Sequence, residues 1–160
     1  MEKRKKFPER PRRLTFIHRR FTNPVYFITF CTYRRCGFLA VDPVFQAFTK
    51  FSLEASERGI SVGRFVIMPD HVHLFVRLNM EMRLGRWIAG LKQTLSKAGG
   101  HSRSDSRVWQ EGFFDHVLRS AASYGQKWEY VRQNPVRAGL VKRSELWPYQ
   151  GEIVPIEGSS

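Results

Sequence analysis

The chain has 160 residues, enough for one domain with a sizeable core but not for two, and its 42% hydrophobic and 14% aromatic content excludes a disordered chain. No apolar stretch is long enough to span a bilayer, and the basic N-terminus lacks the apolar segment of a secretory signal, so we expect no membrane partner. The 27 Lys and Arg residues against 14 Asp and Glu give a net charge of +13, which favours a phosphate-rich partner.

Residues 1–22 are predicted to form a basic arm, because residues 1–20 carry nine basic and two acidic side chains. Each contact between a basic side chain and a phosphate releases counterions, so this composition is typical of nucleic-acid binding. A solubilising tail and an anionic membrane surface are the alternatives. The residues of the arm that we expect to contact DNA are Lys3, Arg4, Lys5, Lys6, Arg12 and Arg13.

The first predicted elements alternate between strand and helix. Residues 24–33 are apolar on both faces and rich in β-branched and aromatic types, which predicts a buried central strand. Residues 42–58 carry apolar side chains at helical spacing, with Asp42 as the expected N-cap and Gly59 as the end of the helix. Residues 60–67 and 71–78 are two strand-like runs around the short break Met-Pro-Asp, which predicts a hairpin.

The second half of the chain continues the alternation. Residues 82–98 are predicted to be helical, residues 113–119 to form a strand, and residues 122–133 to form a helix that Pro135 stops. No regular element is expected in the tail, residues 141–160. The order is that of a ferredoxin-like βαββαβ fold of the α+β class, with an antiparallel sheet and one additional C-terminal helix.

The strand 71–78 carries the first candidate site. Alternate side chains of a strand point to opposite faces, so Val72 and Leu74 belong to an apolar face and His71 and His73 to the other. Two imidazoles at this spacing can lean toward one divalent ion. An ordinary pair of half-buried histidines is the alternative that this short pattern leaves open.

The helix 122–133 carries the second candidate site. Tyr124, Trp128 and Val131 share the core stripe, whereas Tyr130 lies off it, one turn before Asn134. The helix therefore presents a phenol and a carboxamide together. The alternative is a partly exposed packing aromatic followed by a residue at the end of the helix.

Three stretches together resemble one family. The stretch "FVIMPDHVH" contains two histidines around a hydrophobic residue, which resembles the HUH motif of single-strand DNA endonucleases. The stretches "VWQEGFFDHVLR" and "WEYVRQNPVRAGLV", with the later Trp147-Pro148-Tyr149, resemble the REP-associated tyrosine transposases, relatives of the single-tyrosine transposases of insertion sequences. The resemblance extends over about residues 24–149.

The resemblance implies a ferredoxin-like catalytic domain, residues 23–140, that nicks and rejoins single-stranded DNA at palindromic REP hairpins. It implies that Tyr130 attacks a phosphate and remains joined to the 5′ end of the DNA. It also implies a Mg²⁺ or Mn²⁺ ion held by His71, His73 and a third ligand from the tyrosine helix. That ligand is expected to be Asn134, with Gln133 as its rival.

Further DNA contacts are expected from Arg77, on the histidine face, and from Arg83, Arg86 and Lys92 of the helix 82–98. Unpaired bases could stack on Trp109, Phe113 or Tyr33, although core packing is the commoner role of such residues. The palindrome-associated branch of the family is monomeric, which the tail fits, whereas the insertion-sequence relatives are dimers.

The two cysteines, Cys31 and Cys36, form no disulfide or metal pattern, which indicates a reducing setting, and we expect a cytoplasmic protein associated with the nucleoid. Two other functions are weighed against the transposase hypothesis. One is a module that binds structured nucleic acid without cutting it, and the other is a metal-dependent hydrolase that uses water as its nucleophile.

Overall fold

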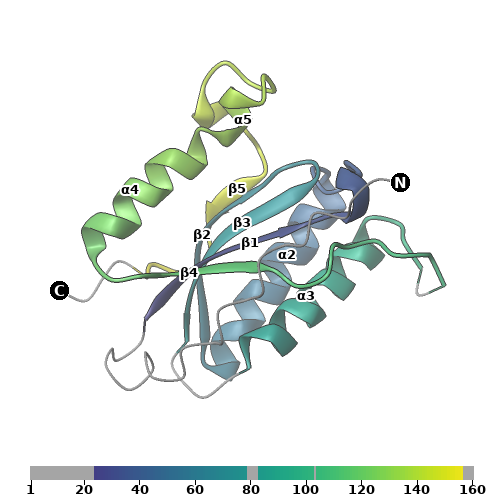
Figure 1. Ribbon diagram of the computed structural model, residues 1–160, viewed down its shortest axis with the longest axis horizontal. Helices are drawn as coiled ribbons and strands as arrows, with labels where there is room; N and C mark the ends of the chain where they lie inside the picture. The colour runs from purple at the N-terminus through teal and green to yellow at the C-terminus, as the bar shows by residue number, and fades with distance from the viewer. Residues whose placement is uncertain (1–23, 79–82, 103, 157–160) are drawn as a thin grey trace, which may run out of the picture.

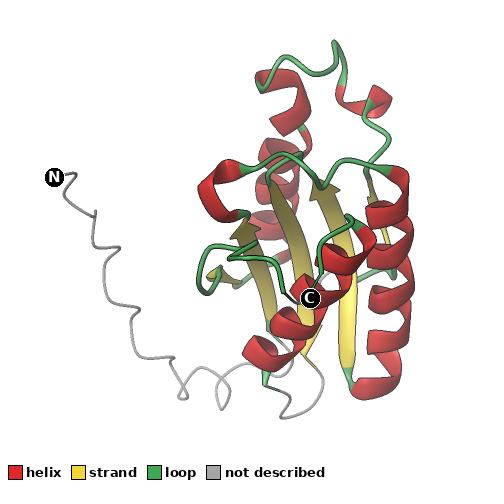
Figure 2. Ribbon diagram, turned by 90° about the vertical axis from the view of Figure 1, so that its right-hand side faces the viewer, coloured by secondary structure: helices red, strands yellow, loops and turns green. Residues whose placement is uncertain are grey.

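The computed structural model describes residues 24–78, 83–102 and 104–156. Its centre is a five-stranded antiparallel sheet. The strands lie in the order β4 (Phe114–Leu118), β1 (Val25–Cys31), β3 (His71–Leu78), β2 (Ile60–Ile67) and β5 (Gln150–Glu152). Helices α2 (Asp42–Ala55) and α3 (Leu84–Ala98) cover one face, and α4 (Ala121–Arg132) lies on the other (Figures 1 and 2). The predicted ferredoxin-like α+β architecture with an additional C-terminal helix is confirmed.

Strands β1 (Val25–Cys31) and β3 (His71–Leu78) run side by side through the middle of the sheet. Their side chains alternate between two cores. Tyr26 and Ile28 join the core beneath α2 and α3, whereas Phe27 and Phe75 join the smaller core beneath α4. This double burial explains why β1 is apolar on both faces.

The hairpin prediction is confirmed: β2 (Ile60–Ile67) and β3 are antiparallel neighbours. The Met68 amide donates to the His71 carbonyl at 2.8 Å, which closes the turn. Gly59 ends the preceding short helix η2 (Ser56–Arg58) with φ of 79°, a conformation that suits glycine. The expected cap was wrong, because Val41 is the N-cap of α2, and Asp42 accepts a hydrogen bond from the Tyr149 hydroxyl instead.

The last part of the chain passes from one edge of the sheet to the other. Strand β4 (Phe114–Leu118) pairs with β1 at one edge, and α4 follows it. Helix α4 ends at Arg132, and Pro135 lies near the start of a further short helix, α5 (Asn134–Arg137). Proline is accommodated there because the first turn of a helix needs no amide donor. Helix α4 therefore ends before Pro135, and the chain continues directly into a second short helix.

The tail contributes more than the sequence predicted. Residues Gln150–Glu152 form β5, which pairs with β2 at the other edge of the sheet. Trp147 is buried, and its indole nitrogen donates to the Ile67 carbonyl at 3.0 Å. Within the described residues, no helix is long and apolar enough to cross a membrane.

Candidate active site

His71 and His73 project from β3 into the face of the sheet that α4 partly covers. In the strand register His71 lies opposite Cys31 of β1, and His73 lies opposite Thr29. The two imidazoles meet edge to face, and their Nε2 atoms lie 3.1 Å apart. The spacing of two residues along a strand brings both rings to one point, as the sequence predicted.

The opposite nitrogen of each ring has a fixed partner. His71 Nδ1 lies 2.7 Å from the Asp70 carboxylate, and His73 Nδ1 lies 2.7 Å from Thr29 Oγ1. An ionised carboxylate can only accept a hydrogen bond, so His71 carries its proton on Nδ1 and donates it to Asp70. If His73 also carries its proton on Nδ1, the Thr29 hydroxyl accepts that hydrogen bond. Both Nε2 atoms then present lone pairs to the shared point, the arrangement of metal-binding histidines with outer hydrogen-bond partners.

The surroundings of both histidines favour the neutral imidazole. Burial lowers the pKa of His71, although the Asp70 carboxylate acts in the opposite direction. Burial also lowers the pKa of His73, to about 3, and the neighbouring His71 and the cationic Lys127, Arg137 and Arg35 add to the effect. A neutral imidazole is the form that binds a metal ion.

Asp70 is itself held in place by Arg35. The guanidinium donates from Nε to the second Asp70 oxygen at 2.7 Å and from Nη1 to the Cys31 sulfur at 2.9 Å. Burial raises the pKa of Asp70, but the hydrogen bond and charge of His71, with the charge of Arg35, lower it overall. Arg34 and Arg35 both have positive φ, of 53° and 56°, a conformation that costs energy in residues other than glycine.

The third member of the cluster is Asn134, at the start of α5. Its side-chain amide Nδ2 lies 3.0 Å from His71 Nε2 and 2.9 Å from His73 Nε2. Gln133 points elsewhere, with its amide 3.5 Å from Ser144 Oγ. The break between α4 and α5 therefore brings Asn134, and not its rival, to the histidines.

These three side chains fit a divalent ion. Ligands about 2.1 Å from an octahedral ion lie about 3.0 Å from one another, and the three contacts measure 2.9–3.1 Å. A half-turn of the Asn134 amide replaces Nδ2 with Oδ1, which is an oxygen ligand. The described residues contain no group of three or more His, Cys, Asp or Glu that could hold a metal ion, so a metal site here would need an amide as its third ligand.

Tyr130 lies on α4 away from the core stripe, as predicted, and its side chain is 65% exposed. The guanidinium of Arg137 lies 4.1 Å from the centre of its ring. The positive charge of Arg137 also lowers the pKa of His73, so the same guanidinium affects both the phenol and the histidine cluster. Among the described residues, no hydrogen bond joins Tyr130 directly to either histidine.

Positive charge surrounds the cluster. Lys127 of α4 lies 4.9 Å from the centre of the Phe27 ring, and that ring stacks on His73. Lys127, Arg137 and Arg35 all act on His73, so the site has the potential that attracts a phosphate. The sequence patterns did not predict Arg35, Arg137, Asp70 or Thr29 as part of this site. Only Asp70 had a local signal, because it immediately precedes the histidine pair.

Comparison with known proteins identifies the family. The family model described as "Transposase IS200 like" matches residues 21–134, which span β1 to the first residue of α5 and include both histidines, Tyr130 and Asn134. The chain belongs to this family. The IS200-like transposase assignment confirms the family resemblance seen in the sequence.

Two curated relatives are similar to this IS200-like transposase. The REP-associated tyrosine transposase of Escherichia coli (strain K12) is 26% identical over 95 residues, covering 58% of this chain and 54% of that protein. A putative REP-associated tyrosine transposase of Haemophilus influenzae is 23% identical over 136 residues, covering 78% and 77%. The chain thus spans about half the length of the first relative and about three quarters of the second.

A solved structure shares the fold. It is a REP-associated tyrosine transposase bound to a REP hairpin, with a TM-score of 0.68 and 21% sequence identity. The match covers 88% of this chain and 87% of that one. The IS200-like transposase described here therefore has the same arrangement of strands and helices.

The residues predicted to contact DNA fall into three groups. Those of the basic arm, Lys3 to Arg13, lie outside the described residues. Arg83 and Arg86 are exposed at the start of α3, which covers the face of the sheet opposite to α4 (Figure 1).

Arg77 and Lys92 have structural partners in this IS200-like transposase. Arg77 donates to the Ile156 carbonyl at 3.1 Å. Lys92 donates to the carbonyls of Gln110 and Gly112 at 3.0 and 2.6 Å. These contacts tie each side chain to the fold, and a DNA contact by either stays a prediction.

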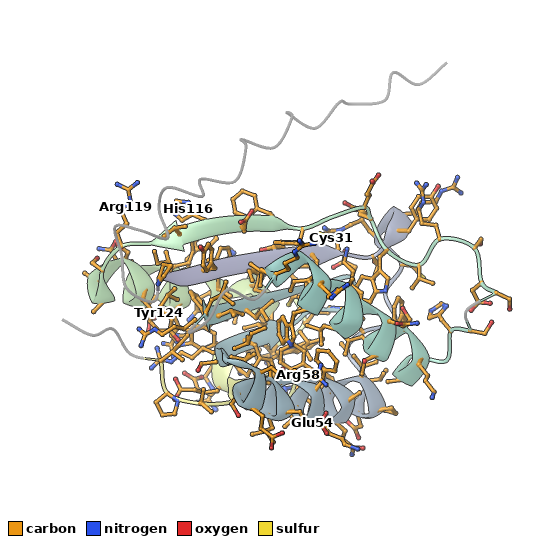
Figure 3. All side chains as sticks on the ribbon, turned by 90° about the horizontal axis from the view of Figure 1, so that it is seen from below. Cys31, Glu54, Arg58, His116, Arg119 and Tyr124 are labelled. Carbon is orange, nitrogen blue, oxygen red and sulfur yellow. The ribbon has the colours of Figure 1, made fainter. Side chains whose placement is uncertain are left out.

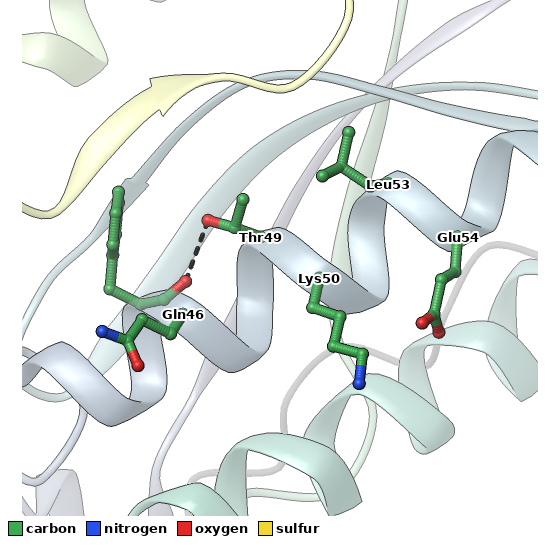
Figure 4. A pocket seen from close by; sticks show the side chains of 6 residues that line it. Gln46, Thr49, Lys50, Leu53 and Glu54 are labelled. Atoms are coloured by element: carbon green, nitrogen blue, oxygen red, sulfur yellow. Dashed lines mark hydrogen bonds between the residues drawn. The ribbon is translucent and has the colours of Figure 1, made fainter.

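A shallow hollow lies elsewhere, along the exposed side of α2 (Figure 4). Leu53 and Lys50 line it, and the Thr49 hydroxyl donates to the Phe45 carbonyl within it. Because α2 covers the opposite face of the sheet, this hollow is separate from the histidine cluster.

Proposed function

We propose that this chain is a metal-dependent single-strand DNA endonuclease and strand transferase, which nicks and rejoins DNA at palindromic REP-type hairpins through a 5′-phosphotyrosine. The observation that carries the proposal is the convergence of His71, His73 and Asn134 at mutual distances of 2.9–3.1 Å. Family membership and the exposed phenol of Tyr130 support it.

His71, His73 and Asn134 would hold the ion through two imidazole nitrogens and one amide oxygen. When bound, Mg²⁺ or Mn²⁺ polarises the scissile phosphate and offsets the charge that develops in the transition state. Asp70 and Thr29 keep the imidazoles oriented by holding their Nδ1 protons. The three surrounding cations hold the phosphodiester in place.

Tyr130 supplies the nucleophile. Its phenolic oxygen attacks the phosphorus and loses its proton, while the bond from phosphorus to the 3′ oxygen breaks and that oxygen takes up a proton. The product is a 5′-phosphotyrosine and a free 3′-OH. Because the phosphoester bond is conserved in the tyrosine adduct, a 3′-OH can reverse the reaction without ATP.

Arg137 is the residue best placed to couple the nucleophile to the phosphate. Its guanidinium lies 4.1 Å from the centre of the Tyr130 ring, and its charge lowers the pKa of His73. A guanidinium in that position can pair with a phosphate oxygen while it orients the phenol. The net charge of +13 supports a nucleic acid as the substrate.

The test uses a pool of DNA hairpins with randomised stems and single-stranded flanks, labelled at the 3′ end and incubated with Mn²⁺. We expect a labelled covalent adduct on a denaturing gel with the unmodified protein and none with Tyr130→Phe. Tyr149→Phe is the matched control, because its hydroxyl bonds Asp42 of α2. Cutting that survives Tyr130→Phe would indicate a hydrolase, and binding without cutting in any divalent metal would indicate a binding module.

A further inference from the structure

We propose that Phe114 is the stacking platform for an unpaired nucleobase next to the scissile phosphate. This inference rests on the proposed function and adds a residue that contacts the single strand. Phe114 is the first residue of β4, and its side chain is 59% exposed. Among the described residues, only Tyr130 exposes a larger fraction of a large hydrophobic side chain.

The exposure of Phe114 follows from the alternation of β4. Its neighbour Phe113 packs against the core beneath α2 and α3, as does Val117. Phe114 and Leu118 point to the other face, where Leu118 is buried but Phe114 is not. A single exposed apolar side chain is common on protein surfaces, so the case for Phe114 depends on what lies beside it.

The strand register places Phe114 in the same row as the metal site. Phe114 lies opposite Thr29, and Thr29 lies opposite His73. Thr29 Oγ1 contacts His73 Nδ1, so both point to the face that carries the cluster. Two strand spacings, about 10 Å, separate Phe114 from His73, a distance comparable with the dimensions of a nucleotide.

The next row of side chains on this face, formed by His116 and Phe27, also contains exposed or cation-contacting rings. His116 is exposed and lies opposite Phe27, whose ring stacks on His73 and lies beneath Lys127. Figure 3 shows the His116 side chain standing out from β4 at the margin of the molecule. The open end of this face therefore combines rings with cations. That is the composition of surfaces that bind single strands by stacking bases and attracting phosphates.

Binding is measured without catalysis, in the Tyr130→Phe background with EDTA and at low salt. The probe is a fluorescent DNA hairpin with adenine flanks on both sides, in which one abasic residue is moved through each position. We expect Phe114→Ala to weaken binding about 10-fold and Phe114→Trp to preserve it, because any aromatic ring can stack. At the flank position whose base stacks on Phe114, the abasic residue should weaken binding by the Tyr130→Phe parent about 10-fold. The same abasic residue should not weaken binding by the Phe114→Ala variant any further.

Leu53→Ala is the control, because Leu53 is 52% exposed on α2, across the sheet. The inference would be overturned if Phe114→Ala and its Tyr130→Phe parent bound the hairpin with equal affinity. It would also be overturned if the abasic residue reduced the affinity of both proteins by the same factor at every position. A variant that changes the oligomeric state but not the DNA affinity would assign Phe114 to a protein contact instead. Adduct formation is read separately, so the inference can fail while the proposed function stands. A parent that binds none of these hairpins would overturn both.

Discussion

His71 Nδ1 lies 2.7 Å from one oxygen of Asp70, and the other oxygen of that carboxylate accepts a hydrogen bond from Arg35 at 2.7 Å. Arg35 therefore fixes the orientation of the Asp70 carboxylate, which in turn fixes the orientation of the His71 imidazole. We predict that Asp70→Asn lowers the affinity for Mn²⁺ by about 10- to 100-fold, because the neutral amide orients and polarises the ring less well. Isothermal titration calorimetry measures this. Glu152→Gln, which removes an ion pair with Arg64 between β5 and β2, should leave the affinity unchanged. Unchanged affinity in Asp70→Asn would contradict the prediction.

Asn134 and Gln133 are adjacent amides with different partners, which gives a matched pair of variants. Because Asn134 contacts both histidines and Gln133 contacts Ser144, we predict that Asn134→Ala weakens Mn²⁺ binding at least about 10-fold and that Gln133→Ala does not. Mn²⁺ binding is followed by the loss of the free-ion electron paramagnetic resonance signal. The reverse order of the two variants would transfer the ligand role to Gln133.

The burial of His73 predicts a dependence of stability on pH in the metal-free protein. Its pKa is about 3 in the folded state and 6.5 in the unfolded chain, so below pH 6 the unfolded state binds the extra proton. The free energy of unfolding should therefore fall as the pH falls, by about 1.4 kcal/mol per pH unit from this residue. Urea denaturation between pH 7 and pH 4 measures the slope. The slope should be shallower in His73→Gln and unchanged in His116→Gln, whose imidazole is exposed. Parallel curves for all three proteins would refute the prediction.

Lys92 tests the difference between a structural and a DNA-binding cation. Its ammonium holds the carbonyls of Gln110 and Gly112, so Lys92→Met leaves two acceptors without their charged donor. We predict a loss of about 1–3 kcal/mol in the free energy of unfolding. Arg86→Gln, which changes an exposed residue of the same helix, should leave stability unchanged and weaken DNA binding. Chemical denaturation and fluorescence anisotropy separate these outcomes. A stable Lys92→Met variant with weakened DNA binding would reverse the assignment.

The amino-acid pattern was sufficient to predict most of the local structure. The bounds of β2 and β3 agree with their apolar runs, and the faces of β3 follow from alternation alone. The same alternation predicted that both histidines share a face, and helical spacing predicted that Tyr130 stands apart from the core. These features depend on neighbours within one strand or one helix, so their physical cause is local.

What only the tertiary structure decided is which distant residues meet. The strand register selected Thr29 as the partner of His73, and the break between α4 and α5 selected Asn134 over Gln133. Strand β5 went unpredicted because a three-residue strand has too short a pattern and exists through its pairing with β2. The basic residues show the same limit. Their charge can be read from the sequence, but only the packed structure determines that Lys92 binds backbone carbonyls while Arg35 holds the Asp70 carboxylate beside His71.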